Sequence, residues 1–297
     1  MTATEAGADG PTITSIAEKT GWRQISGPLF RKYVGLFLAV VCIALLSNGL
    51  FEIFFSYREH TESLIRIQRE QAEGAAEKIG LFIKEIVNQV GWTTQLSWSA
   101  TYDPVTITQR RVDNMLLLRQ VPAITDVAQL DGAGIEQLRM SRNPLEVVKN
   151  KQDYSQDPKF TVAMEKKVYC GPMYLRRQSE PYMTLSVAGT RLNTGVTVVE
   201  VGLKLVWDVV SQSKVGEHRQ AYVIDTQGRL IAHTDISMVL RNTDMTQLAQ
   251  VRAARTNGAG AGGEAKDIND REVLSAYAPV APLGWLVFVE MPIEEAK

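Results

Sequence analysis

One arginine and several hydroxyl-bearing side chains lie between positions 139 and 184, and together they have the chemistry of a small-molecule cleft. The candidate ligand-binding residues are Arg139, Tyr154, Tyr169, Tyr174, Tyr182 and Thr184. A guanidinium supplies a fixed positive charge, and hydroxyl groups donate and accept hydrogen bonds among apolar walls. We therefore expect a small ligand, with an anionic or carboxylate group opposite Arg139 as the first choice. Taken singly, each tyrosine is more often a half-buried strand residue, and a strand arginine is often only solvated.

The histidines do not add a metal centre or a catalytic pair. A strand with His233 and Asp235 would place both on one face, and His218 is the remaining nearby histidine, but tight divalent sites usually need three or four converging ligands. The sequence has neither a nucleophile elbow nor an HExxH helix, and the glycine-rich residues 257–263 lack the Gly-Lys-Ser/Thr ending of a phosphate loop. We expect no metal, no cofactor and no catalytic residue in this chain, and whether the whole protein is an enzyme stays open.

Composition excludes some partners. The 297 residues carry a formal net charge of -1, without the excess of Lys and Arg that nucleic-acid binding requires. A hydrophobic content of 45% is ordinary for a folded chain. Cys42 lies inside an apolar run and Cys170 lies far outside it, so we expect no disulfide between them.

The elements that must position the candidate residues begin with an uncharged apolar run of 19 residues, 33–51. A helix of that length spans about 28 Å, close to the hydrocarbon thickness of a bilayer. Arg31 and Lys32 precede the run and Glu52 follows it, so the positive-inside rule places the N-terminus in the cytoplasm and the rest outside. We predict a cytoplasmic tail over 1–28 and a transmembrane helix over 29–55 of a bacterial inner-membrane protein. A cleaved signal peptide and a buried core helix are the alternatives.

A long amphipathic helix is predicted over residues 56–98, which contain no proline and carry apolar residues at helical spacing. Two shorter helices are the alternative. Part of the apolar stripe must cover a sheet, and the rest is expected to pair with the same helix of a second subunit in a homodimer. Ile79 and Phe82 are the positions at which charged substitutions should abolish that dimer.

From residue 124 onward the pattern changes to short strands separated by turns. Residues 124–130 and 135–141 flank Asp131-Gly132-Ala133-Gly134 and read as a hairpin. Further strands are predicted over 167–174, 181–190, 195–204, 221–225, 229–233, 272–279 and 285–290, with helices over 206–214 and 245–255. We draw a boundary near Ser211, which gives a membrane-distal module over 99–210 and a membrane-proximal module over 211–297. The fold class is therefore α+β, with two tandem antiparallel-sheet modules after the helices.

Four segments of the chain resemble the strand-bearing segments of double Cache (dCache) sensor domains of bacterial transmembrane receptors. They are DYSQDPKF (153–160), VYCGPMYLRRQSEPYMTLSVAG (168–189), QAYVIDTQGRLIAHTD (220–235) and AYAPVAPLGWLVFVEMP (276–292). The resemblance covers residues 33–297. It implies two PAS-like modules, of which the distal one binds a small ligand and the proximal one relays the change through a second membrane helix. That helix is not in this sequence, so we expect a fragment of a longer receptor, nearest to a histidine kinase, with nucleotide cyclase and chemoreceptor outputs as alternatives.

The chain departs from the amino-acid-binding members of that family at residues 156–160. Those members carry an Arg-x-Trp-Tyr-like cluster where this chain has Gln-Asp-Pro-Lys-Phe. The bidentate guanidinium and the indole of the family pattern are therefore missing at this place, which puts an amino-acid ligand in doubt. A membrane-tethered enzyme and an adaptor that binds partner proteins without a small ligand are the competing functions.

Overall fold

The computed structural model describes residues 28–95, 104–142, 147–148, 151–177, 180–191, 194–212, 219–241, 243–257 and 262–295. The predicted tail lies outside these residues except for Pro28, and so does His218. The chain divides into a unit that ends at Arg58 and a compact unit from Glu59 to Lys297. Helix α1, Pro28–Thr93, runs through both.

The part of α1 that belongs to the first unit contains the apolar segment Lys32–Gly49, which is long and apolar enough to cross a membrane. Its large apolar side chains are exposed, among them Phe37 at 71% and Leu46 at 67%. A helix that is apolar on all sides needs an apolar solvent, which a bilayer supplies. This helix is consistent with the predicted membrane anchor.

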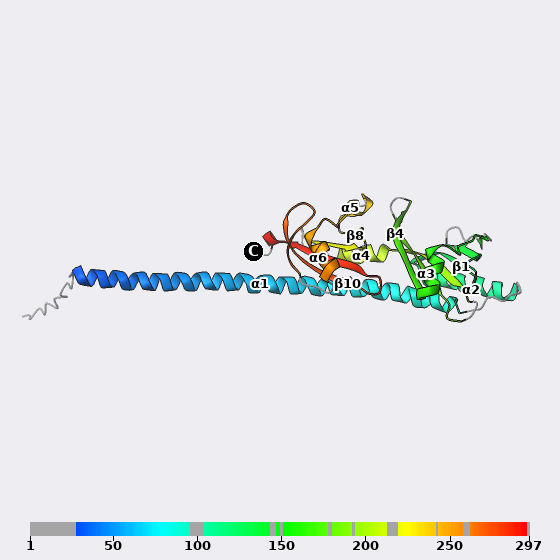
Figure 1. The fold of residues 1–297 in the computed structure, drawn as a ribbon, viewed down its shortest axis with the longest axis horizontal. Helices are drawn as coiled ribbons and strands as arrows, with labels where there is room; N and C mark the ends of the chain where they lie inside the picture. Colours follow the sequence, from blue (N-terminus) through cyan, green and yellow to red (C-terminus); the bar gives the residue numbers. More distant parts are fainter. Residues whose placement is uncertain are drawn as a thin grey trace, which may run out of the picture. The chain divides into compact units, whose positions relative to one another are not determined.

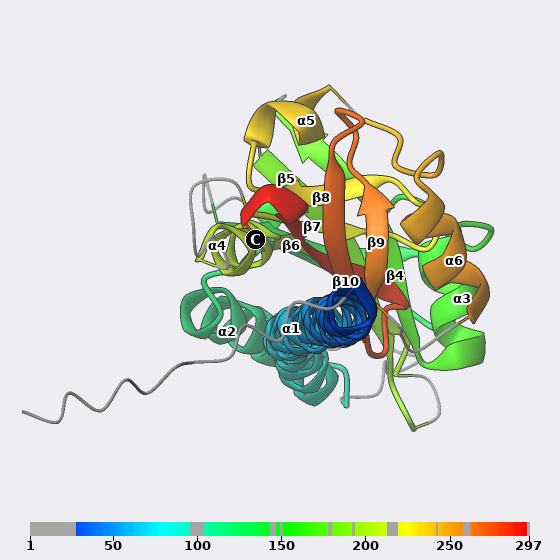
Figure 2. The same ribbon diagram turned by 90° about the vertical axis from the view of Figure 1, so that its left-hand side faces the viewer.

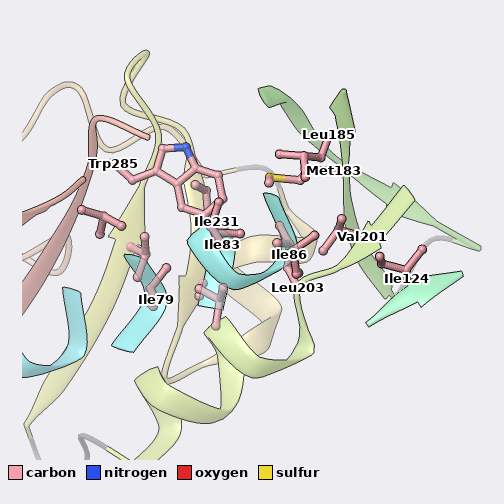
Figure 3. Packing of buried hydrophobic residues seen from close by; sticks show 14 of the residues in the cluster. Ile79, Ile83, Ile86, Ile124, Met183, Leu185, Val201, Leu203, Ile231 and Trp285 are labelled. Carbon is pink, nitrogen blue, oxygen red and sulfur yellow. The ribbon is translucent and has the colours of Figure 1, made fainter. Parts of the chain in front are cut away.

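The part of α1 that belongs to the second unit is amphipathic, and its apolar stripe is buried against the chain's own sheets. Ile79, Ile83, Ile86 and Val90 are at most 2% exposed. Figure 3 shows Ile79, Ile83 and Ile86 packed among residues of both sheets: Met183, Leu185, Val201, Ile231 and Trp285. The expectation that Ile79 lies in a dimer interface is therefore wrong, because its side chain is already covered within the chain. Phe82 is half-buried against the same cluster.

The first sheet has six strands in the order β3-β2-β1-β6-β5-β4. Their bounds are β1 Ile124–Leu130, β2 Glu136–Ser141, β3 Val147–Val148, β4 Val168–Arg176, β5 Glu180–Ala188 and β6 Val196–Gly202. All neighbouring strands are antiparallel. The predicted hairpin 124–141 is confirmed as β1 and β2, and the next three predicted strands are β4, β5 and β6.

The second sheet has five strands in the order β8-β7-β11-β10-β9, again antiparallel. Their bounds are β7 Gln220–Ile224, β8 Leu230–His233, β9 Gly263–Lys266, β10 Glu272–Val280 and β11 Trp285–Pro292. Strand β9 begins at Gly263, the last residue of the glycine-rich segment 257–263. Residues 258–261 of that segment lie outside the described residues.

Short helices cover the sheets. They are α2 Pro104–Gln120, α3 Pro158–Lys166, α4 Lys204–Gln212, α5 Ile236–Leu240 and α6 Ala249–Asn257, with a final turn of 3-10 helix η1 Ile293–Glu295. Figure 2 shows α1 and α2 on the same side of the sheets, and buried residues of both helices join one cluster with the two sheets. Helix α3 packs on β4, β5 and β6; Figure 1 shows α3 next to β4. The first sheet is thus layered between α1 and α2 on one face and α3 on the other.

Candidate ligand-binding site

The candidate site is the face of the first sheet that α3 partly covers, which we call the α3 face. The strand register places one residue from each of five neighbouring strands in a single row across the sheet: Arg139, Ala128, Val198, Ser186 and Tyr169. Side chains of alternate residues share a face, so Thr184 and Tyr182 follow Ser186 on the same face, and Tyr174 pairs with Tyr182. The five predicted strand residues therefore all lie on the α3 face.

Arg139 and Tyr154, the first two predicted residues, contact each other directly. Nη2 of Arg139 donates to the Tyr154 hydroxyl at 3.1 Å and to Oε2 of Glu136 at 2.6 Å, and Nε donates to the same carboxylate at 3.0 Å. The Tyr154 hydroxyl donates to Gln152 at 2.9 Å, and Nζ of Lys159 lies 4.0 Å from the centre of the Tyr154 ring. The hydrogen bonds that Arg139 donates to Glu136 raise the pKa of Arg139. The positive charge of Arg139 is thus compensated by a carboxylate of the chain itself.

A glycine fixes the loop that carries Tyr154. Gly134 has φ +84, and a Cβ added there would lie 2.7 Å from the Cα of Ser155. The Gly134 carbonyl accepts a hydrogen bond from the Tyr154 amide at 2.9 Å. Only glycine tolerates both this backbone conformation and this close approach. The β1–β2 turn and the Tyr154 loop are therefore held against each other.

A second cluster gathers around Glu200, a residue that the sequence reasoning missed. The Tyr174 hydroxyl donates to Glu200 Oε2 at 2.5 Å, and the Thr184 hydroxyl lies 3.1 Å and 3.0 Å from the two carboxylate oxygens. The Tyr182 ring stacks on Tyr174 with centroids 6.3 Å apart. Burial, with Glu200 as a second cause, raises the pKa of Tyr174, so its hydroxyl remains a donor at neutral pH. Tyr174 and Thr184 thus donate to one carboxylate, and Tyr182 lies against Tyr174.

Asp126 and Arg176 complete this cluster. Asp126 lies opposite Glu200 in the register of β1 and β6, and Nη1 of Arg176 donates to Asp126 Oδ2 at 2.7 Å. Burial alone would raise the pKa of Asp126, but hydrogen bonds from Thr125 and Arg176 outweigh it and lower that pKa. The Arg176 guanidinium also lies 5.4 Å from the centre of the Tyr182 ring. Arg176 therefore balances Asp126.

Tyr169 lies apart from both charged clusters. It packs against an apolar group that includes Phe160 and Ala163 of α3, and burial raises its pKa. Ser186, directly opposite Tyr169 in the register, is fully buried, and its hydroxyl has no hydrogen-bond partner among the described residues. An unsatisfied buried hydroxyl is costly. Ser186 is therefore a further candidate for ligand contact.

The charges on the α3 face do not cancel. Two arginines, 139 and 176, face three carboxylates, 126, 136 and 200, which leaves a formal charge of -1. Glu136 and Asp126 each pair with a guanidinium. Among the described residues, the partners of Glu200 are instead the hydroxyl groups of Tyr174 and Thr184. Glu200 is also the only charged residue in the strand Val-Thr-Val-Val-Glu-Val-Gly, which is the sequence signal that could have identified it.

Residues that raised other hypotheses have structural roles here. Asp157 caps α3 by accepting a hydrogen bond from the Lys159 amide at 2.9 Å, and Pro158 begins the helix. His233 accepts a hydrogen bond from the Asp235 amide at 2.8 Å, and Asp235 in turn caps α5. Across the described residues, no three His, Cys, Asp or Glu side chains are placed to hold a metal ion.

Comparison with known proteins gives one family and several similar structures. The family model for the Cache domain (dCache_1) matches residues 56–297. The sensory domain of the Campylobacter jejuni chemoreceptor Tlp3 is 15% identical with a TM-score of 0.65, and the match covers 82% of this chain and 98% of that one. A Tlp3 structure also exists with isoleucine bound. The search of curated proteins returned no match.

Two further solved structures come from different classes of receptor. The extracellular domain of the candidate histidine kinase soHK1S-Z6 is 18% identical with a TM-score of 0.59, and the match covers 81% of this chain and 98% of that one. The second is the ligand-binding domain of the Pseudomonas aeruginosa PAO1 amino-acid chemoreceptor PctC in complex with GABA. It is 14% identical with a TM-score of 0.58, and the match covers 77% of this chain and 100% of that one. These likenesses show a shared fold.

Proposed function

The chain belongs to the Cache-domain family, and from this premise we propose that it is the extracytoplasmic ligand-sensing region of a transmembrane signal-transduction receptor. The single observation that carries the proposal is the α3 face, where predicted and additional polar side chains gather on one side of the first sheet. The opposite face is apolar where it meets α1, whereas the α3 face holds carboxylates that a merely solvated face would leave exposed: the side chains of Glu136 and Asp126 are 1% and 13% exposed. We infer that a small molecule binds between the α3 face and the segments that cover it.

The charges of the α3 face indicate a ligand that carries an ammonium group. Glu200 offers a carboxylate bordered by the Tyr174 hydroxyl and the Thr184 hydroxyl, and aromatic rings next to a carboxylate favour a cation. Arg139 keeps a side chain that is 34% exposed, so its end of the face suits the anionic group expected from the sequence. The ligand proposed here is therefore a small zwitterion. Isoleucine and GABA, bound by the similar proteins above, have both groups.

Signal transfer would run from β4 to the second module. Tyr174 and Arg176 of the Glu200 cluster lie on β4, and Met173 of the same strand packs against the core of the first sheet and against a second cluster in the other module. A ligand can shift this arrangement only by the difference in its affinity for the two states. In the receptor we propose, a histidine kinase is the output, with a cyclase or chemoreceptor output as alternatives.

The membrane context and the dimer belong to the same proposal. The N-terminus would be cytoplasmic, the sensor region periplasmic, and α1 anchored in the bacterial inner membrane. Because Ile79 is inside the chain's own core, a homodimer would use exposed apolar residues of the same helix, such as Leu81 at 57% and Trp92 at 79% exposure.

The test is a thermal-shift screen of the whole chain in nanodiscs against organic acids, amines and amino acids, because a ligand that binds only the native state raises the melting temperature. Glu200→Gln and Arg139→Ala should each weaken binding of the active compound by about tenfold or more, as expected for a lost charge-assisted contact. Glu264→Gln, an exposed glutamate of the second sheet, is the control. If no compound shifts the melting temperature, or if both variants bind normally, the α3 face is not the sensor site.

A further inference from the structure

A cavity lies at the end of the first module where α4 leads on to the second module, and it shares only Tyr182 with the predicted residues of the α3 face. It is a groove of about 750 Å³ whose walls come from α1, the end of α2, the start of β5 and α4. We call it the junction groove. A volume of this size is typical of small-molecule sites. We propose that the junction groove is a second ligand site, and that it takes an amphipathic cation: an apolar or aromatic body with one ammonium group.

The walls of the junction groove suit an aromatic body. Phe82, Tyr182 and Trp207 line it, and each is only half-buried. The Trp207 indole is held in place because Nε1 donates to the Ile231 carbonyl at 2.8 Å. The polar atom of the indole is therefore satisfied inside the protein, and the rest of the ring presents an apolar surface to the groove.

The rim of the junction groove determines the charge of the ligand. Three carboxylates line it, Glu85, Glu180 and Asp208, against one ammonium group, that of Lys204. The formal charge of the lining is therefore -2. A carboxylate rim above aromatic walls attracts a cation both by charge and by the ring quadrupoles. An anion of the same shape would be repelled. The ligand expected in the junction groove therefore has the opposite charge to the anionic group expected at Arg139.

The position of the junction groove gives such a ligand a way to act on the receptor. Trp207 packs against the large cluster shared by α1 and both sheets, and also against the second cluster of the other module. Phe82 belongs to α1, and Tyr182 belongs to the strand next to β4. A molecule in the groove would touch α1 and α4 at once, and Trp207 of α4 in turn contacts the core of the second module. It would stabilise one arrangement of these elements.

The experiment uses three probes with the same apolar body and different charges: 2-phenylethylamine, 2-phenylethanol and phenylacetate. Each is titrated by calorimetry into the whole chain in nanodiscs. The amine should bind, and the double variant Glu85→Gln/Asp208→Asn should weaken it by about tenfold, because two of the three rim charges are gone. Lys204→Met should strengthen binding of the amine, which a general loss of folding would not do. Circular dichroism checks the fold of each variant.

Two controls separate this proposal from the function proposed above. Glu264→Gln should leave the affinity for the amine unchanged, and so should Glu200→Gln, which belongs to the α3 face. If Glu200→Gln abolishes binding of the amine, the probe occupies the α3 face and the junction groove proposal fails while the sensor proposal stands. Equal binding of phenylacetate and the amine overturns the proposed charge selection. If the double variant binds all three probes as the wild type does but has a different oligomeric state, a second copy of the chain covers the groove and the proposal fails.

Discussion

Replacing Ile79 by alanine tests whether the apolar stripe of α1 belongs to the core of the chain or to a dimer interface. Ile79 is 0% exposed and is surrounded by residues of both sheets. The substitution removes three buried carbon atoms, worth about 0.8 kcal/mol each by transfer, and leaves a cavity that adds to the loss. We expect the free energy of unfolding to fall by about 3 to 4 kcal/mol.

Urea unfolding followed by circular dichroism, at two protein concentrations that differ a hundredfold, is the assay. If Ile79 belongs to the core, the free energy of unfolding should fall by the same amount at both protein concentrations. The melting temperature should fall by roughly 10 °C for a domain of this size. Lys78→Ala is the control, because Lys78 lies next to Ile79 on the same helix and is exposed; we expect a change below about 0.5 kcal/mol. A loss below about 1 kcal/mol for Ile79→Ala, or a loss that disappears at high protein concentration, would refute the assignment to the core.

Two further predictions concern single residues of the second module and its contact with α1. Burial raises the pKa of Glu290, which accepts a hydrogen bond from the Tyr222 hydroxyl at 2.7 Å; the stability that this group contributes is present below the unfolded pKa of about 4.3 and is lost as pH rises through the folded pKa. The free energy of unfolding of the wild type, measured relative to that of Glu290→Gln by chemical denaturation, should therefore decline from pH 4 upward. A difference between the two proteins that stays constant up to pH 8 would contradict this. Gly80→Ala places a Cβ 2.8 Å from the Ala281 carbonyl oxygen and should destabilise the chain by about 1–3 kcal/mol. Gly74→Ala has nothing within 4 Å and should stabilise it by about 0.5–1 kcal/mol; equal melting temperatures for the two variants would count against the close packing at Gly80.

Local signals predicted most of the sheet strands. The hairpin of β1 and β2 follows from the turn residues Asp131 to Gly134, because glycine supplies the positive φ that the turn needs. Helix α3 was missed although Asp157 and Pro158 form a capping residue and a first-turn proline, a standard helix start. Strand β9 was missed because its first residue, Gly263, ends a glycine-rich segment.

The partner of an apolar stripe is a long-range property that the sequence does not contain. The spacing of Ile79, Ile83 and Ile86 predicts an apolar helix face, but only the fold shows that both sheets cover that face. Glu200 was missed for the same reason, since its strand reads as core and the hydroxyl groups of Tyr174 and Thr184 come from other strands. The convergence of charges required the strand register.

The shared core has a consequence for building chimeric receptors. The largest cluster contains residues of α1 together with residues of both sheets, such as Val201 from the first and Val287 from the second. Neither sheet has a complete second layer without α1. A sensor transplanted as one module would therefore expose the apolar face that α1 normally covers. An exchange between receptors should move α1 from Glu59 onward with both modules, or redesign the helix surface to match the new sheet.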